Sequence, residues 1–164
     1  MSISRLEQAK LDIIAEFAAI TTDNGFRNDV VQAIGAVRPA SIIPKFPEVE
    51  VVAPKISFNS GGDSSSRSFD ELATIYCVGK FEADTATDAD SPEFQLAQES
   101  LINDFAAVWA NITTKYIADV GGRWCIASMG CTITPSVDFG EKPNRGTVEM
   151  VFQIALNAQG PEFV

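Results

Sequence analysis

The sequence predicts an α+β fold, in which a single antiparallel or mostly antiparallel β-sheet is packed by an N-terminal helix and a long central helix. Apolar residues recur at helical spacing in two stretches, and they alternate at two-residue spacing in the stretches between and after them. The resulting order is helix, three strands, helix, two strands, without the strand–helix alternation of a parallel sheet. We expect one domain over residues 1–164, because a chain of this length buries a sizeable core.

The first helix is predicted close to the N-terminus. Ser4 and Glu7 have the spacing of a capping box, with Ser2 as an alternative cap, and the helix should run to about Ile20. Its buried stripe consists of Ile3, Leu6, the aliphatic stem of Lys10, Ile13, Ile14, Phe17 and Ile20.

A polar segment, TTDNGFRNDV (residues 21–30), separates this helix from an apolar run. Asn24 and Gly25 tolerate a positive φ, so they predict a helix stop and a reversal of the chain, and not a catalytic turn. The stretch FRNDVVQAIGAV (residues 26–37) then favours a strand that ends near Pro39, because a proline cannot donate to a β-ladder.

Two more strands flank a flexible loop. Residues 46–52, FPEVEVV, alternate Glu48 and Glu50 with valines and predict a half-exposed strand. The loop is predicted at about residues 59–68, NSGGDSSSRS, because glycine and serine are dense there. A longer strand is predicted over residues 69–81. One of its faces holds Phe69, Ala73, Ile75, Cys77 and Phe81, and the other holds Leu72, Tyr76 and Val78.

An acidic linker at about residues 83–91 leads into the second helix. Ser91 can cap this helix and Pro92 suits its first turn, while acidic residues on both sides of the cap favour its positive end. The helix should end before Gly121 and Gly122. Its buried stripe consists of Phe94, Leu101, Ile102, Phe105, Val108, Trp109, Ile112 and Tyr116.

The last two strands are predicted to form a hairpin. They are CIASMGCTITPSVDF (residues 125–139) and TVEMVFQIALN (residues 147–157), joined by the turn-rich GEKPNRG (residues 140–146). The expected inner faces hold Cys125, Ala127, Met129, Cys131 and Ile133 in the first strand and Val148, Met150, Phe152, Ile154 and Leu156 in the second.

Composition argues against several classes of function. A net charge of −10 would repel nucleic acid and anionic lipid, and a chain without histidine cannot hold a Ser-His-Asp or Cys-His site or the usual zinc sets. The N-terminus lacks the continuous apolar region of a secretory signal, and no stretch is long enough to span a membrane. We expect a cytosolic protein whose three cysteines, Cys77, Cys125 and Cys131, are reduced.

Two polar segments superficially resemble ligand sites. GGDSSSRS (residues 61–68) lacks the lysine and the spacing of a phosphate-binding loop. Asp84, Asp88 and Asp90 resemble the acids of a calcium loop, but Glu93 stands where such a loop needs glycine. No two carboxylates lie in an apolar context that would shift their pKa values. We therefore expect no catalytic residues, no metal and no cofactor.

One resemblance goes further than composition. The N-terminal helix and the segment after it resemble the start of tail terminator and tail completion proteins of tailed bacteriophages, where a helix is followed by a pattern like T-x-x-N-G-(Y/F)-x-x-D-V. The matching residues are Thr21, Asn24, Gly25, Phe26, Asp29 and Val30. The rest of the chain is similar to that family in the layout of its elements and not in motif.

The resemblance implies a structural virion protein and not an enzyme. Such a subunit forms a ring, typically a hexamer, that caps the tail tube, ends tube growth and presents a face for head joining. The implied partners are other copies of the chain, the tail tube protein and a head-completion or neck protein. DNA would only pass through the lumen, no membrane would be bound, and the protein would lie in the virion tail after assembly in the bacterial cytoplasm.

An acidic subunit fits a lumen that must repel phosphate. Other phage neck or tail components, such as a connector or a tube subunit, remain an alternative, as does a small-molecule-binding domain. Our candidate contact residues for neighbouring subunits and partners are chosen because they lie in predicted loops; they are Asp63, Arg67, Asp84, Asp88 and Asp90.

Overall fold

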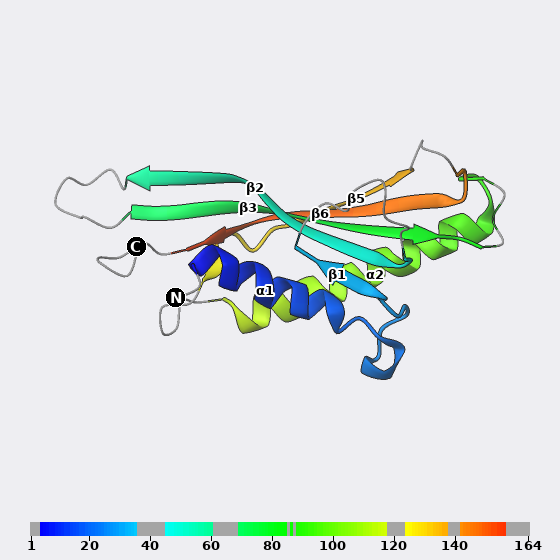
Figure 1. Cartoon of the computed structure of the whole chain (residues 1–164), viewed down its shortest axis with the longest axis horizontal. Coiled ribbons are helices and arrows are strands. Elements are labelled where there is room, and N and C mark those ends of the chain that lie inside the picture. Colours follow the sequence, from blue (N-terminus) through cyan, green and yellow to red (C-terminus); the bar gives the residue numbers. More distant parts are fainter. Residues whose placement is uncertain are drawn as a thin grey trace.

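A computed structural model describes residues 4–35, 45–60, 69–84, 86, 88–117, 124–137 and 142–156. Two helices and a curled six-stranded sheet make up the fold, so the α+β prediction is confirmed (Figure 1). In chain order the elements are α1 (Arg5–Ala18), the 3₁₀ turn η1 (Thr22–Asn24), β1 (Gln32–Ile34), β2 (Glu48–Ser60), β3 (Phe69–Glu82), α2 (Pro92–Lys115), β4 (Cys125–Ile126), β5 (Thr132–Val137) and β6 (Arg145–Ala155).

The strand order is β1-β2-β3-β6-β4, and β5 pairs with β6 along the same edge as β4. All neighbours are antiparallel except β1 and β2, which run parallel with Gln32 opposite Glu48. The sheet is therefore mixed and not purely antiparallel. The reason lies in residues 35–47, over which the chain returns to begin β2 beside the beginning of β1.

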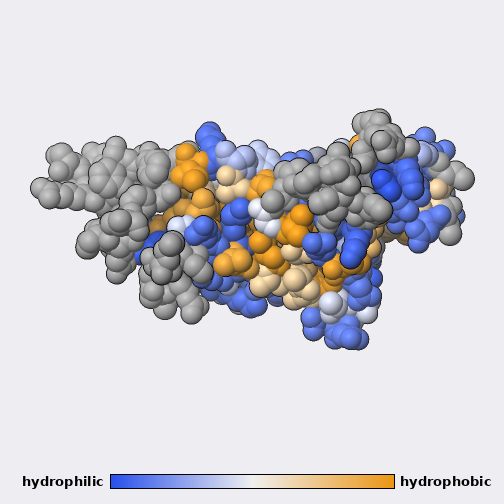
Figure 2. All heavy atoms as spheres, in the orientation of Figure 1, coloured by the Kyte–Doolittle hydropathy of each residue, from blue (hydrophilic) through white to orange (hydrophobic). Residues whose placement is uncertain are grey.

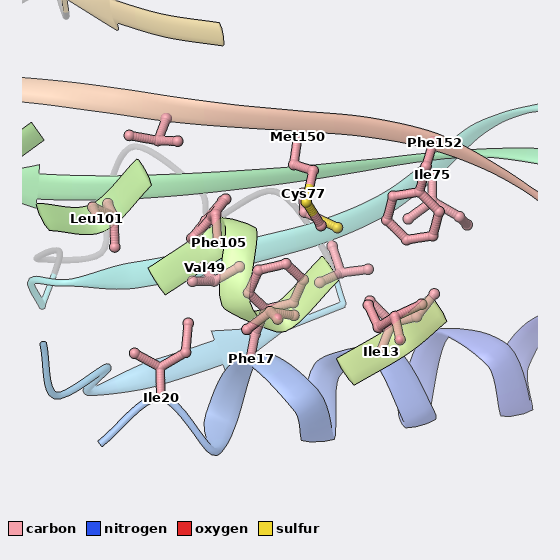
Figure 3. Close-up of a cluster of buried hydrophobic side chains, with 14 of the residues drawn as sticks. Ile13, Phe17, Ile20, Val49, Ile75, Cys77, Leu101, Phe105, Met150 and Phe152 are labelled. Carbon is pink, nitrogen blue, oxygen red and sulfur yellow. The ribbon is translucent and has the colours of Figure 1, made fainter. Parts of the chain in front are cut away.

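Both helices lie across one face of the sheet, and the hydrophobic core fills the space between the helices and that face (Figures 1 and 3). Phe17 of α1 meets Phe105 of α2 edge to face, with ring centroids 4.9 Å apart. The predicted inner face of β6 is confirmed, because Val148, Met150, Phe152, Ile154 and Leu156 are all buried. The same holds for Ala73, Ile75, Cys77 and Phe81 of β3.

The helix starts follow the sequence prediction. Ser4 Oγ accepts a hydrogen bond from the Glu7 backbone, and the Glu7 carboxylate accepts one from the Ser4 backbone, which completes the capping box of α1. Ser91 Oγ accepts from the Phe94 backbone at the start of α2, with Pro92 in its first turn. The glycines expected after α2 lie outside the described residues.

The prediction of a half-exposed strand at residues 46–52 is wrong. Glu48 is 0% exposed and Glu50 is 3% exposed, although both lie on the face away from the helices. Here β2 runs between β1 and β3, so side chains of the neighbouring strands, such as Lys80, can lie beside the two glutamates on the outer face. Lys80 of β3 offsets part of the cost of burying charge, because its Nζ lies 2.5 Å from Glu50 Oε1.

Two other predicted strands are shorter than expected. Residues 26–31 are irregular, so within the described part of the stretch 26–37 only Gln32–Ile34 forms a strand. The expected end at Pro39 lies outside the described residues. The expected strand at 125–139 is split into β4 and β5. Ile126 pairs with Ile154, and Ile133 pairs with Met150. The chain therefore advances seven residues from β4 to β5 while β6 advances only four.

The extra residues of the split strand bulge away from the sheet. Ala127 and Met129 are consequently exposed and do not lie on an inner face, while Cys125 and Cys131 are only partly buried. Of the predicted loop at residues 59–68, Asn59 and Ser60 belong to β2, and residues 61–68 lie outside the described part of the chain.

Cys77, Cys125 and Cys131 are thiols that form no disulfide. Burial, together with the neighbouring Cys131, raises the pKa of Cys77 well above that of an ordinary thiol, and burial also raises the pKa of Cys131. At pH 8 iodoacetamide should therefore modify Cys77 in the native protein at least about a hundredfold more slowly than in urea, because both thiolate formation and access are suppressed. Mass spectrometry of the alkylated peptides measures this ratio, and equal rates in the two states would contradict the buried placement of Cys77.

Candidate assembly surfaces

The polar segment at residues 21–30 is a hydrogen-bonded joint between α1 and β1 (Figure 1). Thr21 caps η1, with its Oγ1 accepting from the Asn24 backbone at 3.3 Å. The Asn24 side chain donates to the Ala19 carbonyl at 2.9 Å, which satisfies one of the free acceptors at the end of α1. Gly25 has φ +88°, a conformation that side chains rarely adopt. The predicted chain reversal is confirmed.

The second half of the joint closes the reversal. Asp29 Oδ1 accepts from the Thr22 backbone at 2.7 Å and from Thr22 Oγ1 at 3.1 Å. The Val30 backbone donates to the Ile20 carbonyl at 2.8 Å, and the side chains of Phe26 and Val30 pack against the core. All six residues that match the phage pattern thus have a local structural task.

A buried carboxylate of α2 holds the joint against the body of the protein. Asp104 is 3% exposed and accepts hydrogen bonds from the backbones of Arg27 and Asn28, each at 2.9 Å. It also accepts from the Asn28 side chain at 2.7 Å. Sequence reasoning missed Asp104, because a single acid in a helix carries no signal of partners 76 and 77 positions away.

A groove of about 430 Å³ runs beside the joint. It is lined by Asn24, Gly25, Phe26, Arg27, Asn103, Asp104, Ala107 and Asn111. Its polar lining consists mainly of the exposed amides of Asn24, Asn103 and Asn111, with one cation, Arg27, and one buried carboxylate, Asp104. The groove therefore offers hydrogen bonds to a neighbouring chain without a strong charge preference.

A second groove of about 430 Å³ follows the outer side of α1. It is lined by Glu7, Lys10, Leu11, Ile14 and Gly35. Lys10 Nζ donates to the Gly35 carbonyl at 2.9 Å, which fixes the end of β1 to the helix. Leu11 is 50% exposed, and hydrophobic residues gather in this middle part of the face shown in Figure 2.

The acidic linker before α2 is partly anchored. Asp84, Asp88 and Asp90 are exposed as expected, while Ala83 and Ala86 are buried between them. The Asp88 side chain accepts from the Asp90 backbone at 3.0 Å, and the Asp88 carbonyl accepts from Ser91 Oγ at 2.9 Å. Asp88 therefore has a turn-forming role whether or not it touches a neighbour.

Of the five contact candidates, the structure describes Asp84, Asp88 and Asp90, which lie within the same linker. The acidic linker lies where β3 ends and α2 begins, at one end of the elongated molecule (Figure 1). Asp63 and Arg67 lie outside the described residues, in the connection between β2 and β3 that begins at the opposite end of both strands.

The sheet face away from the helices is a third surface. Val52, Tyr76 and Val151 form one row across β2, β3 and β6, and each is partly exposed. They alternate with core residues along their strands, so they project away from α1 and α2. Within the described ranges no helix lies on this face, and its residues differ in exposure, because Glu48 and Glu50 are buried whereas Val52, Tyr76 and Val151 are partly exposed.

Among the residues that the structure describes, no group of three or more acids and cysteines is placed to hold a metal ion. No helix in the described part of the chain is both long and apolar enough to cross a membrane.

Comparisons with known proteins do not assign the chain to a family. No protein-family model matches the sequence, and no curated protein matches it. The fold is similar to a chain of a solved structure described as "Virion of native gene transfer agent (GTA) particle", with 12% identity and a TM-score of 0.47 over 92% of this chain and 91% of that one. A likeness of this size carries no argument about function.

Proposed function

We propose that this protein is a bacteriophage tail terminator, a subunit of a hexameric ring that caps the tail tube, stops its growth and presents the head-joining face. The observation that carries the proposal is the joint at residues 21–30. Its six residues match the phage pattern in order and spacing, and they fold into one locked unit.

Shape and charge support the same proposal. At about 3.3 Å per residue, β3 alone is roughly 43 Å long, and both helices cover one face of the sheet only. Such a subunit has ends and a face available for heterologous contacts, which are the contacts that build rings above a dimer. The net charge of −10 suits a lumen through which DNA must slide.

Native mass spectrometry and negative-stain microscopy of the purified protein, alone and with tail tubes, test the proposal. A closed ring of six 17.6 kDa chains would have a mass of about 106 kDa, and rings should appear singly or at tube ends. Long tubes formed by this protein alone would point to a tube subunit. A monomer that does not bind to tube ends, and whose melting temperature rises when a metabolite is added, would favour a small-molecule-binding domain.

The acidic linker is our proposed contact with a neighbouring subunit or partner. The triple variant Asp84→Asn, Asp88→Asn and Asp90→Asn removes three charges but keeps the side-chain oxygen that accepts in the turn at Asp88. Weaker ring formation is expected from this variant. A control, Asp23→Asn with Glu99→Gln, removes two exposed charges outside the linker and should assemble as the wild type does. Equal assembly of both variants would remove the linker from the interface.

A further inference from the structure

The two edges of the sheet differ in how they present their backbone. On one edge, β1 pairs only with residues 48–50 of β2, so Val51–Ser60 has no strand on that side among the described residues. On the other edge, β4 and β5 lie end to end along β6. Unpaired edge strands are templates for another copy of the chain, and proteins that remain soluble block them.

A side chain of α2 reveals which backbone groups of β5 face outward. Gln98 Nε2 donates to the carbonyls of both Ser136 (3.0 Å) and Thr147 (3.3 Å). These two residues are opposite each other in the β5–β6 pair, so one donor reaches both carbonyls only if both point into the space between the strands. Because the pattern alternates, the backbone groups of Ile133, Pro135 and Val137 point away from β6.

Pro135 therefore occupies the middle one of the three outward-facing positions of β5. It is exposed, and it has no N–H to give to an added strand. The backbone groups of position 135 point away from β6, so this position makes no hydrogen bond to Val148, which lies opposite it. A β-branched residue at position 135 would therefore leave the pairing with β6 unchanged. Nothing in the pairing with β6 thus requires proline at this position.

The neighbouring strand on this edge is closed by a different device. The Ile126 backbone of β4 donates outward to the Tyr116 carbonyl at 2.9 Å, so the end of α2 occupies the bond that an added strand would use. Beyond Ile126 the bulged residues interrupt the edge. Among the described residues of this edge only β5 offers a regular stretch, and Pro135 lies within it.

A second copy of the chain carries a matching edge. In β2 a register shift between Val52 and Lys55, at Pro54, breaks the edge, and the regular stretch after it is Lys55–Ser60. This stretch has six residues, as β5 does. The two strands run in opposite directions within the sheet, so a head-to-tail copy would place its β5 antiparallel to β2. Such a contact is heterologous and would extend chain after chain.

We infer that Pro135 is an edge-blocking residue, which prevents β5 from pairing with the Lys55–Ser60 edge of a second copy. The proline removes the central donor of the outward face and leaves too few backbone bonds for a lasting contact. With this edge blocked, copies of the chain can associate only through surfaces other than the edges of the sheet. This inference does not depend on the proposed terminator function, because it concerns unwanted growth of the sheet in any setting.

The variant Pro135→Val restores the donor with a residue that favours strands. We expect the fraction of protein in species larger than the wild-type assembly to rise at least fivefold in light scattering after size exclusion, with a matching rise in thioflavin T fluorescence. The matched control is Pro143→Val, at an exposed proline outside the strands, and it should behave as the wild type does. If Pro135→Val has the wild-type size distribution and no thioflavin T signal, the inference is wrong.

A peptide measurement keeps the inference testable if Pro135→Val folds poorly. The probe is a capped, fluorescently labelled peptide with the sequence of residues 55–60, and the second variant is Pro135→Ala, which restores the N–H without a branched side chain. Circular dichroism first establishes that each protein is folded. We expect the peptide to bind Pro135→Ala at least ten times more tightly than the wild type in fluorescence anisotropy. Equal affinity for the two folded proteins would overturn the inference.

Discussion

Replacing Asp104 with alanine should lower the free energy of unfolding by about 3–5 kcal/mol, which is a large part of the stability of a domain of this size. The Asp104 carboxylate accepts three hydrogen bonds from Arg27 and Asn28, and in the variant these donors would lose their partner in a partly buried place. Urea unfolding followed by the fluorescence of the buried Trp124 measures the effect.

Two comparisons separate this effect from a general weakening of α2. Asn103→Ala, at an exposed position next to Asp104 in the same helix, should change stability by less than about 0.5 kcal/mol. Asp104→Asn keeps one acceptor oxygen and should fall between the wild type and the alanine variant. If Asp104→Ala costs no more than Asn103→Ala, the carboxylate does not hold the joint.

The capping features of this fold were predictable because their partners are close in sequence. Ser4 and Glu7 are three residues apart, and so are Ser91 and Phe94, so the pattern and the contact appear in the same short stretch. Strand periodicity similarly located the inner face of β6, where alternation continues without interruption.

Features that depend on distant neighbours were not predictable. Glu48 and Glu50 look like the solvent-facing half of an alternating strand, and nothing within residues 46–52 indicates that both side chains are buried in the fold. The bulge between β4 and β5 depends on the register with β6, which local alternation does not encode. The loop residues chosen as contacts carry no motif that would identify a neighbouring chain, and they remain predictions.

The joint at residues 21–30 has both kinds of feature, those set by nearby residues and those set by distant ones. Its turn residues were readable from sequence, since Asn24 and Gly25 mark a helix stop by their own backbone preferences. Its attachment to α2 through Asp104 was not readable. The position of the joint relative to the sheet is therefore set by a contact between segments far apart in sequence, and the Asp104 variants test this contact directly.

The second large effect is expected at Gly79 of β3, where Phe105 and Leu101 of α2 pack closely against the strand. A Cβ at this position would lie 2.6 Å from Phe105 Cζ and 3.1 Å from Leu101 Cδ2. Phe105 is fully buried and packs edge to face on Phe17, so its ring has no room to withdraw (Figure 3). Gly79→Ala should therefore lower the free energy of unfolding by about 2–3 kcal/mol, despite the smaller backbone entropy of alanine in the unfolded chain.

Urea unfolding of a double-mutant cycle tests the steric cause. Phe105→Leu removes the ring atoms that a Cβ at Gly79 would meet, so the double variant should be at least about 1 kcal/mol more stable than the sum of the single effects predicts. The control is Gly130→Ala, because a Cβ there would have Ser128 Oγ as its nearest neighbour, at an ordinary 3.7 Å. Its stability should stay within about 0.5 kcal/mol of the wild type. Additive effects at Gly79 and Phe105 would show that crowding by the Phe105 ring is not why β3 carries glycine at this position.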